Sequence, residues 1–342
     1  METLHPDSKA EVAEMLAALS AEGTRTQIVG GRHHVGRAPA RETDTELWTT
    51  QLDRVIAYDP AEMIAVVGAG MRIRELQSVL AEGDQEWPVD AHPEATVGGV
   101  IAAGVTGMRR LRTGLMRDTV VELELVTGDG RLIRSGARTV KNVTGFDVHR
   151  LATGSLGSLG AIVQVALKVR PRPKVRGALT FQAGGVDLAD ALLAGVPLPA
   201  AVIAEPDHIE LILEGWPEEV DEQTEATRAV STGFEIHEDL PVTRPDERWP
   251  EAPIVGEAAV TPTRIAALAR ESDRWRALIG VGLVWFPFED EDRWDRVQAV
   301  VAEQQGTMTR IRGGGDTAGA SSRDAGISAR LLGSFDPAGI LS

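Results

Sequence analysis

The 342-residue chain contains no cysteine. It therefore cannot bind an iron–sulfur cluster through thiolates, form a disulfide, use a thiol nucleophile or attach a flavin through sulfur. It also lacks an apolar run of the about 20 residues that a membrane-spanning helix needs. Its first residues, METLHPDSKAEVAEML, predict a capped amphipathic helix and not a signal peptide. These absences predict a cytoplasmic protein with no transmembrane segment.

Basic residues are also fewer than acidic ones: 35 Lys and Arg face 51 Asp and Glu, and the formal net charge is −16. Phosphate-rich partners require basic clusters, so this balance argues against binding of nucleic acid or of an anionic membrane surface. The densest basic stretch is MRRLRTGLMR, which contains Arg109, Arg110, Arg112 and Arg117. Two interpretations stay open for it, a solvent-exposed loop and a local site for an anion or an acidic partner.

Length and a hydrophobic content of 43% favour two moderate cores over one. The N-terminal half predicts short strands over 24–70, a helix over 72–82, a β-hairpin over 119–136 that turns at GDG, and a strand over 160–173. Two prolines close that last strand, and we place a domain boundary there. Beyond it, antiparallel strands mixed with amphipathic helices predict a second α+β layer, and 312–326 predicts a surface loop.

A strand, a GxG turn and a helix follow one another in VVGAGMRIREL, residues 66–76. This order is also found in nicotinamide-binding Rossmann units, but a lone GxG is weak evidence. The third glycine is missing, because Arg72 and Ile73 occupy that region, and several strands precede the turn. We therefore interpret it as a glycine turn that leads into a packing helix.

Three further glycine-rich turns are more informative. The first is IVGGRHHVGRA at 28–38, the second is ATVGGVIAAGVTGMRR at 95–110, and the third is KNVTGFDVHRLATGSLGSLGAI at 141–162. Consecutive backbone N–H groups in such turns can form an anion-binding concavity, and the missing Cβ atoms let a phosphate approach. Taken alone, the first turn is equally compatible with a hairpin that exposes two histidines. Together the three turns predict one extended polar ligand with a phosphate in its middle.

A metal site is not expected at the first turn. Only two adjacent histidines are present, and no Asp or Glu stands at ligand spacing. We therefore expect the chain to have no metal-binding residues.

In their order and spacing, these turns resemble the FAD-binding subunits of glycolate oxidase complexes, within the vanillyl-alcohol-oxidase superfamily of PCMH-type FAD-binding proteins. The stretches that carry the resemblance are VGGRHH, WPVDAHPEATVGGVIAAGVTGMRRLRTGLMRD, GDGRLIRSGARTVKNVTGFDVHRLATGSLGSLGAI and FDPAGILS. It covers residues 10–173 closely and the last fifteen residues well, whereas 175–320 agree only in general character.

The resemblance implies an α+β fold, with a two-subdomain PCMH-type FAD-binding domain at 1–173 and a smaller α+β cap at 174–324. Residues 325–342 would return to the first domain. It also implies FAD bound non-covalently, although His33 and His34 are the candidates for a covalent link in a chain without cysteine.

The resemblance further implies a role for each glycine turn. Backbone amides around the FAD pyrophosphate fall on Gly30, Gly31, Arg32, His33 and His34. The turn along the pyrophosphate and flavin falls on Thr96, Val97, Gly98 and Gly99. The small residues that pass the isoalloxazine correspond to Ala102, Ala103, Thr106 and Gly107. The adenosine side corresponds to Gly154, Ser155, Gly157, Gly160 and Ile162.

The chain also departs from the family. Phe146 stands where a tyrosine is usual and Ser158 where a threonine is usual, and the first turn is shorter than the GGGTK type. Relatives that oxidise hydroxy acids themselves have a histidine pair in an HxGDGNxH-type segment of the cap. Beyond residue 175 this chain has only His208 and His237, and neither has that context. No catalytic residue is assigned.

The function that the resemblance implies is oxidation of a small 2-hydroxy acid such as glycolate, with FAD as hydride acceptor. A homologous FAD-binding catalytic subunit and an iron–sulfur subunit are the expected partners. Two alternatives stay open. One is a self-sufficient FAD-dependent oxidase or dehydrogenase of another alcohol or hydroxy acid, in which His149 and the four arginines could form a carboxylate pocket. The other is a non-catalytic assembly subunit.

Overall fold

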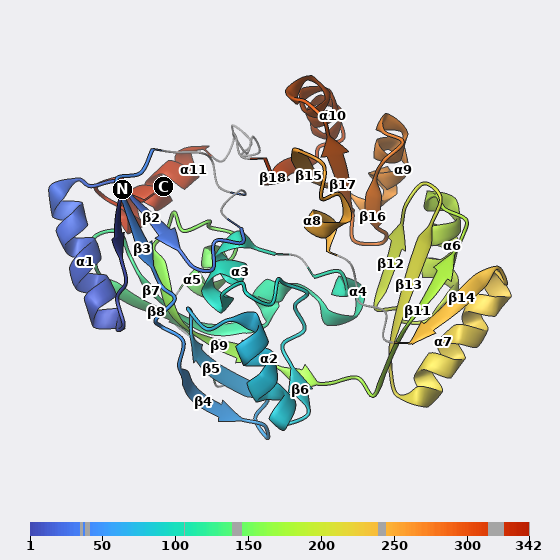
Figure 1. The fold of residues 1–342 in the computed structure, drawn as a ribbon, viewed down its shortest axis with the longest axis horizontal. Coiled ribbons are helices and arrows are strands. Elements are labelled where there is room, and N and C mark those ends of the chain that lie inside the picture. Colours follow the sequence, from blue (N-terminus) through green and yellow to red (C-terminus); the bar gives the residue numbers. More distant parts are fainter. Residues whose placement is uncertain are drawn as a thin grey trace. The chain divides into compact units, whose positions relative to one another are not determined.

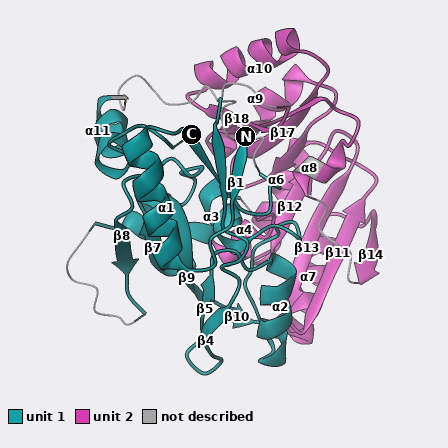
Figure 2. Ribbon diagram, turned by 60° about the vertical axis from the view of Figure 1, so that its left-hand side comes forward, with its two compact units in different colours: residues 1–106, 115–172, 320–342 teal, residues 107–114, 173–319 magenta. Residues whose placement is uncertain are grey.

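The computed structural model describes residues 1–34, 37, 42–105, 107–138, 146–238, 244–313 and 325–341. The chain forms two compact units (Figure 2), which are residues 1–106, 115–172 and 320–342 (unit 1) and residues 107–114 and 173–319 (unit 2). Each unit combines helices with strands, so the α+β class is confirmed. The sequence prediction differs from this division because it left residues 107–114 in the first domain, ended that domain at 173 and began the returning segment at 325.

A small parallel sheet opens unit 1 (Figure 1). Its strand order is β1 (Glu2–Leu4), β3 (Thr45–Trp48) and β2 (Thr26–Val29). The predicted N-terminal helix is α1 (Lys9–Glu22), whose cap Ser8 accepts a hydrogen bond from the N–H of Glu11. Val12, Leu16 and Leu19 of α1 pack with Leu47 of β3 in one core cluster. These residues form the apolar face of α1, and its burial stabilises the helix.

The second sheet of unit 1 is antiparallel throughout. Its order is β4 (Val55–Asp59), β5 (Ile64–Gly68), β9 (Ala161–Lys168), β7 (Val120–Val126) and β8 (Leu132–Gly136), and a separate pair joins β6 (Gln85–Glu86) to β10 (Arg170–Pro171). The predicted hairpin is confirmed as β7–β8. Because β5 is antiparallel to both neighbours, the GxG turn after it belongs to no Rossmann unit. A Cβ on Gly68 would lie 2.0 Å from the carbonyl oxygen of Leu52, so this glycine permits close backbone packing.

Short helices cover the antiparallel sheet of unit 1. They are α2 (Ile73–Glu82), α3 (Val97–Ala103), the 3₁₀ turn η2 (Met116–Asp118), α5 (Val148–Ala152) and α11 (Ala325–Phe335). Leu76 and Leu80 of α2, and Val100 and Ile101 of α3, are fully buried in the same core cluster as β5, β7 and β9. This packing fixes α3, which contains the second glycine turn, against the sheet.

Unit 2 is built on one eight-stranded antiparallel sheet. Its order is β14 (Phe234–Glu238), β11 (Val175–Phe181), β13 (Ile209–Gly215), β12 (Ala201–Ala204), β16 (Arg276–Leu278), β17 (Leu283–Phe288), β15 (Ile254–Ala259) and β18 (Thr307–Arg312). Its helices are α4 (Arg110–Thr113), α6 (Val186–Gly195), α7 (Pro217–Val230), α8 (Pro245–Arg248), α9 (Ile265–Leu268) and α10 (Glu291–Glu303), with 3₁₀ turns η3 (Pro262–Arg264) and η4 (Ala269–Glu271). The segment 262–271 thus forms three short helical pieces, η3, α9 and η4.

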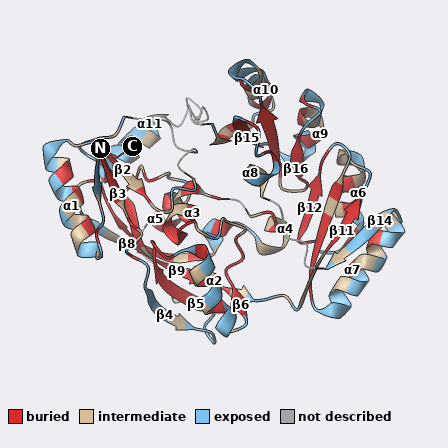
Figure 3. Cartoon of the chain, in the orientation of Figure 1, coloured by how far each residue is buried: buried red, intermediate tan, exposed pale blue. Residues whose placement is uncertain are grey.

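The two faces of this sheet carry different cores. On one face, Phe181, Leu211 and Phe286 pack with residues of α6 and α10. On the other, Trp285 packs in a second cluster that includes Met108, supplied by the segment 107–114. Figure 3 shows the resulting contrast between buried strands such as β12 and the exposed outer side of α7. Among the described residues, no helix has the length and apolar character of a membrane span.

Candidate functional site

One pocket of unit 1 brings the three glycine turns together. Thirteen predicted cofactor residues line it: Gly30, Gly31, Arg32, His33, His34, Thr96, Gly98, Gly99, Ala102, Ala103, Gly157, Gly160 and Ile162. The remaining lining residues, Gln27, Ile28, Thr49, Ala95 and Leu156, were not predicted. The pocket is therefore formed by the end of β2, the start of α3 and the turn before β9.

The turn after β2 supplies backbone donors. Arg32 has a left-handed backbone with φ of 61°. Within the described part of the chain, the N–H groups of Gly30, Gly31 and Arg32 donate to no acceptor. Consecutive free N–H groups at a left-handed residue are the arrangement that binds anions. Because β2 and β3 are parallel, the hairpin interpretation of this turn is wrong.

The side chain of Arg32 has another role. Its guanidinium forms an ion pair with Glu46 and lies 5.1 Å from the centre of the Trp48 ring. The Glu46 side chain is only 3% exposed, so the pair is partly withdrawn from water. The contribution of Arg32 to the pocket therefore comes from its main chain.

The start of α3 leaves space for a ligand, but its backbone N–H groups already have acceptors within the protein. Thr96 caps the helix and accepts a hydrogen bond from the N–H of Gly99 at 3.2 Å, and the N–H of Gly98 donates to the carbonyl oxygen of Ala69 at 2.8 Å. A Cβ on Gly98 would lie 2.8 Å from the Cβ of Ala69, whereas one on Gly99 would meet only the Thr96 hydroxyl, at 2.9 Å. Gly98 thus serves helix–sheet packing, and Gly99 leaves the pocket open.

The third turn is hydrogen-bonded directly to α3. The N–H of Gly154 donates to the carbonyl oxygen of Ile101 at 3.0 Å, and that of Leu156 donates to Ala102 at 2.8 Å. Gly154 and Gly157 have φ of 83° and 87°, which favours glycine at both positions. The hydroxyl of Ser155 is buried and has no hydrogen-bond partner among the described residues.

Five predicted residues do not line the pocket. Val97 is fully buried in the unit 1 core. Gly154 and Ser155 stand beside the lining residues Leu156 and Gly157. Gly107 belongs to unit 2, and Thr106 lies outside the described residues.

Most of the unpredicted lining residues are brought to the pocket by the pairing of two strands. Gln27 and Ile28 lie on β2, and Thr49 directly follows β3. The parallel pairing of these strands places their ends side by side. The strand-like pattern of both segments was visible in the sequence, but their pairing was not.

Arg109 of the arginine-rich stretch has a structural partner. Its guanidinium donates to Glu214 at 3.0 Å, and the two side chains are only 5% and 0% exposed. Glu214 also accepts a bond from Arg176 at 3.3 Å. Arg112 donates to the carbonyl oxygen of Leu198 at 3.4 Å and pairs with Glu219. The proposed anion site at this stretch is therefore wrong for Arg109, which anchors 107–114 to the sheet of unit 2.

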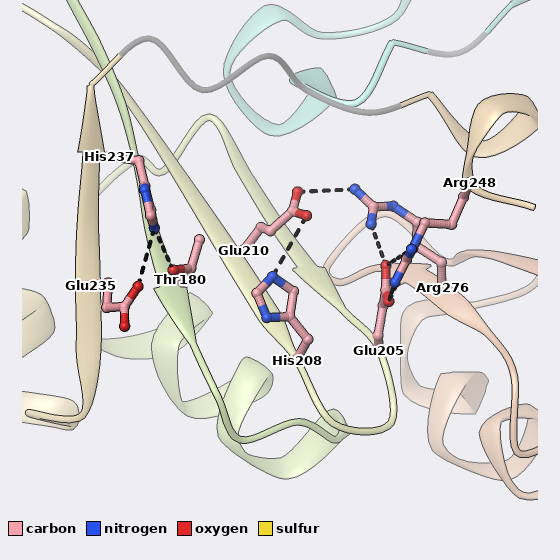
Figure 4. A network of polar contacts seen from close by, with 8 residues as sticks. All are labelled: Thr180, Glu205, His208, Glu210, Glu235, His237, Arg248 and Arg276. Carbon is pink, nitrogen blue, oxygen red and sulfur yellow. Dashed lines mark hydrogen bonds and ion pairs between the residues drawn. The ribbon is translucent and has the colours of Figure 1, made fainter.

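The histidines considered as catalytic residues also have partners, and none of them lines the pocket of unit 1. His149 lies 3.1 Å from the Ser135 hydroxyl, and burial lowers its pKa below the ordinary value. His208 lies 3.7 Å from Glu210, and His237 lies 2.8 Å from the Thr180 hydroxyl (Figure 4). Among the described residues, no three His, Asp or Glu side chains are grouped as a metal site.

Part of unit 1 matches a known protein family. Residues 3–136 match the family described as "FAD binding domain". This match covers less than half of the chain, and it agrees with the predicted resemblance and with FAD as the cofactor.

The curated relatives include an oxidase subunit and two dehydrogenases. The chain is 32% identical over 151 residues to glycolate oxidase subunit GlcE of Escherichia coli (42% of this chain, 43% of the relative). It is 32% identical over 180 residues to the mitochondrial D-2-hydroxyglutarate dehydrogenase of Rattus norvegicus (50% and 32%), and 29% identical over 168 residues to D-lactate dehydrogenase of Archaeoglobus fulgidus (49% and 38%). Each match spans less than half of the relative.

The whole fold has a counterpart among solved structures. An alkyldihydroxyacetonephosphate synthase superposes with a TM-score of 0.74 at 15% identity, over 99% of this chain and 76% of the synthase. At that identity the likeness concerns the fold alone, and it includes unit 2, which the FAD-binding match does not reach.

Proposed function

We propose that FAD occupies the pocket of unit 1 through the three glycine turns. The observation that carries this proposal is the convergence of segments 30–34, 96–103 and 157–162 on one pocket inside a chain whose residues 3–136 match an FAD-binding domain. The fit is supported by the free N–H groups of the first turn and by the open space at Gly99.

The residues present suit the parts of the cofactor. The N–H groups of Gly30, Gly31 and Arg32 would hold the pyrophosphate, whose negative charge they can balance without a basic side chain. Ala102 and Ala103 would leave room for the flat isoalloxazine ring. When bound, FAD supplies an acceptor for a hydride, and the protein supplies its orientation and the exclusion of competing reactions.

We further propose that the cofactor is held without a covalent bond. The chain has no cysteine, and the candidate anchors His33 and His34 lie in the turn assigned to the pyrophosphate. Acid precipitation of the purified yellow protein should leave the flavin in the supernatant. A yellow pellet would contradict this assignment.

The activity that we propose is participation in the oxidation of a small 2-hydroxy acid, within a glycolate oxidase-like complex in the cytoplasm. The relatives named above are glycolate oxidase and D-2-hydroxy-acid dehydrogenases, which supports this substrate class. A homologous FAD-binding subunit would complete the active site. Electrons would leave through an iron–sulfur subunit, because this chain has no cysteine for a cluster.

The first alternative is a self-sufficient FAD-dependent oxidase or dehydrogenase. Two observations favour the subunit role over it: Arg109 is committed to Glu214, and His149 is buried against Ser135. Neither group is then available as a substrate-binding cation or as a general base, the two roles that a 2-hydroxy acid requires. The second alternative is a non-catalytic assembly subunit in which FAD is structural or absent. The formed pocket disfavours only the form without FAD.

Anaerobic mixing separates these roles. The purified, FAD-loaded chain is mixed with glycolate, D-lactate and related acids while the visible flavin absorbance is followed. We expect little or no bleaching with the chain alone, and bleaching once the partner subunits are added. Rapid bleaching without a partner would overturn the subunit role and support the self-sufficient enzyme.

A further inference from the structure

The loop that carries the second glycine turn into the pocket is fixed by the start of α2. The N–H of Ile73 donates to the carbonyl oxygen of Ala95 at 2.9 Å, and that of Arg74 donates to Pro93 at 3.0 Å. The Glu94 carboxylate forms ion pairs with Arg72 and with Arg74. Backbone and side chains thus hold the residues just before Thr96 in one place.

His92 joins this fixed loop to the first glycine turn. Its Nδ1 accepts a hydrogen bond from the N–H of Glu94 at 3.1 Å. Its ring stacks on that of His33, with centroids 4.1 Å apart and planes 26° apart. His33 lines the pocket, whereas His92 does not.

The main chains of the two segments also touch beside this stack. A Cβ on Gly31 would lie 2.7 Å from the carbonyl oxygen of Glu94 and 3.2 Å from the Cα of Ala95. The backbone of the first turn therefore contacts the loop before Thr96 at Gly31. The stacked imidazole rings fix the side chain of His33. Any sideways shift of His33 would separate the rings.

We propose that His92 is a positioning residue for FAD. It holds His33 and the free N–H groups of Gly30, Gly31 and Arg32 at the pocket without contacting the cofactor itself. This inference rests on the proposed placement of FAD in unit 1. Ring stacking of this kind corresponds to about a 3- to 10-fold change in a binding constant.

The test is titration of the cofactor-free chain with FAD, followed by flavin fluorescence. His92→Ala removes the ring and should raise Kd about 10-fold. His92→Phe keeps a ring for stacking and should return Kd to within about 3-fold of the wild-type value. His5→Ala is the matched control, because His5 also stacks on an aromatic ring of unit 1, that of Trp48, outside the pocket.

Each outcome has a separate meaning. If the wild-type chain does not bind FAD, the proposed function fails before His92 is tested. If the wild-type chain binds FAD and His92→Ala binds it equally well, the positioning role is wrong. It is also wrong if His92→Phe is as weak as His92→Ala, or if His5→Ala weakens binding as much. Loss with alanine and recovery with phenylalanine supports it.

Discussion

The two units use polar groups in opposite ways. In unit 1, the pocket is lined largely by glycine, alanine and main-chain donors, and the one arginine on its wall is paired with Glu46. In unit 2, charged side chains are buried with their partners (Figure 4): Arg276 is 1% exposed and pairs with Glu205, and also with Glu210 at 3.0 Å.

This difference separates a ligand site from a structural network. Burial alone would raise the pKa of Glu205, but hydrogen bonds and charges from Arg248 and Arg276 outweigh it, and the pKa is lower than usual. The carboxylate therefore stays ionised and matched by the two arginines. A phosphate-bearing ligand needs donors that the protein has not already matched, and the first glycine turn of unit 1 offers them.

The largest expected effect is loss of flavin on changing the pocket of unit 1. Gly99→Val fills the space that we assign to FAD and should raise Kd for FAD by about 100-fold or more, as expected for overpacking. Its Cβ also crowds the Thr96 hydroxyl, a helix cap worth about 1 kcal/mol, so the fold should persist. The measurement is flavin absorbance per protein after gel filtration, with circular dichroism as the folding check.

Gly233→Val is the control for this variant, since nothing lies within 4 Å of a Cβ at that position in unit 2. It should retain full flavin content. Full flavin content in Gly99→Val would mean that the cofactor lies on another surface.

The second largest effect should be a loss of stability in unit 2, with no change in flavin content. Arg276→Met removes the buried arginine that pairs with both Glu205 and Glu210, and leaves Glu205 only its half-exposed partner Arg248. The change should cost about 3–5 kcal/mol. Unfolding in urea is followed by tryptophan fluorescence, which reports mainly on unit 2 because five of the seven tryptophans lie within 173–319.

The matched control is Arg274→Met, two residues away. Arg274 pairs with Glu251 at the surface, where the side chains are 44% and 59% exposed, so its loss should cost less than about 1 kcal/mol. Equal unfolding midpoints for the two variants would show that the buried network of unit 2 is not structural. Loss of flavin from Arg276→Met alone would show that the two units are not independent in this respect.

The smallest effect concerns pH and His149. Burial lowers the folded-state pKa of this histidine. The charge of Asp147 opposes this shift, and that of Arg150 adds to it. Its stabilising contribution is therefore complete above the unfolded pKa of about 6.5 and is lost as pH falls through the folded-state pKa. One proton accounts for at most about 1.4 kcal/mol per pH unit.

Thermal unfolding of wild type and His149→Gln between about pH 7.5 and 5 measures this effect. The variant should show a flatter fall in Tm on the acid side. Parallel curves for the two proteins would remove His149 as the cause.

The sequence predicted local features well where one segment determines them. The cap at Ser8, the hairpin of β7 and β8, and the helix after the 68–70 turn depend on neighbouring residues, and all three are present. The three glycine turns could be related to one ligand because the family resemblance supplied the contacts between distant segments.

What the sequence could not supply was contact between distant segments outside that resemblance. The parallel pairing of β2 with β3 brings Thr49 to the pocket, and no local pattern encodes it. In the same way, Arg109 looked like a candidate anion ligand, because its partner Glu214 lies 105 residues further along the chain. The glycines of the second turn also looked alike, although Gly98 is required for packing against Ala69 and Gly99 is not.

Hydrogen–deuterium exchange with and without FAD tests the placement of the cofactor most directly. The account predicts slower exchange on adding FAD in segments 30–34, 96–103 and 154–162, and unchanged exchange in β11, β12 and β13 of unit 2. Protection centred on those strands of unit 2, or FAD binding without protection of the three glycine turns, would contradict it.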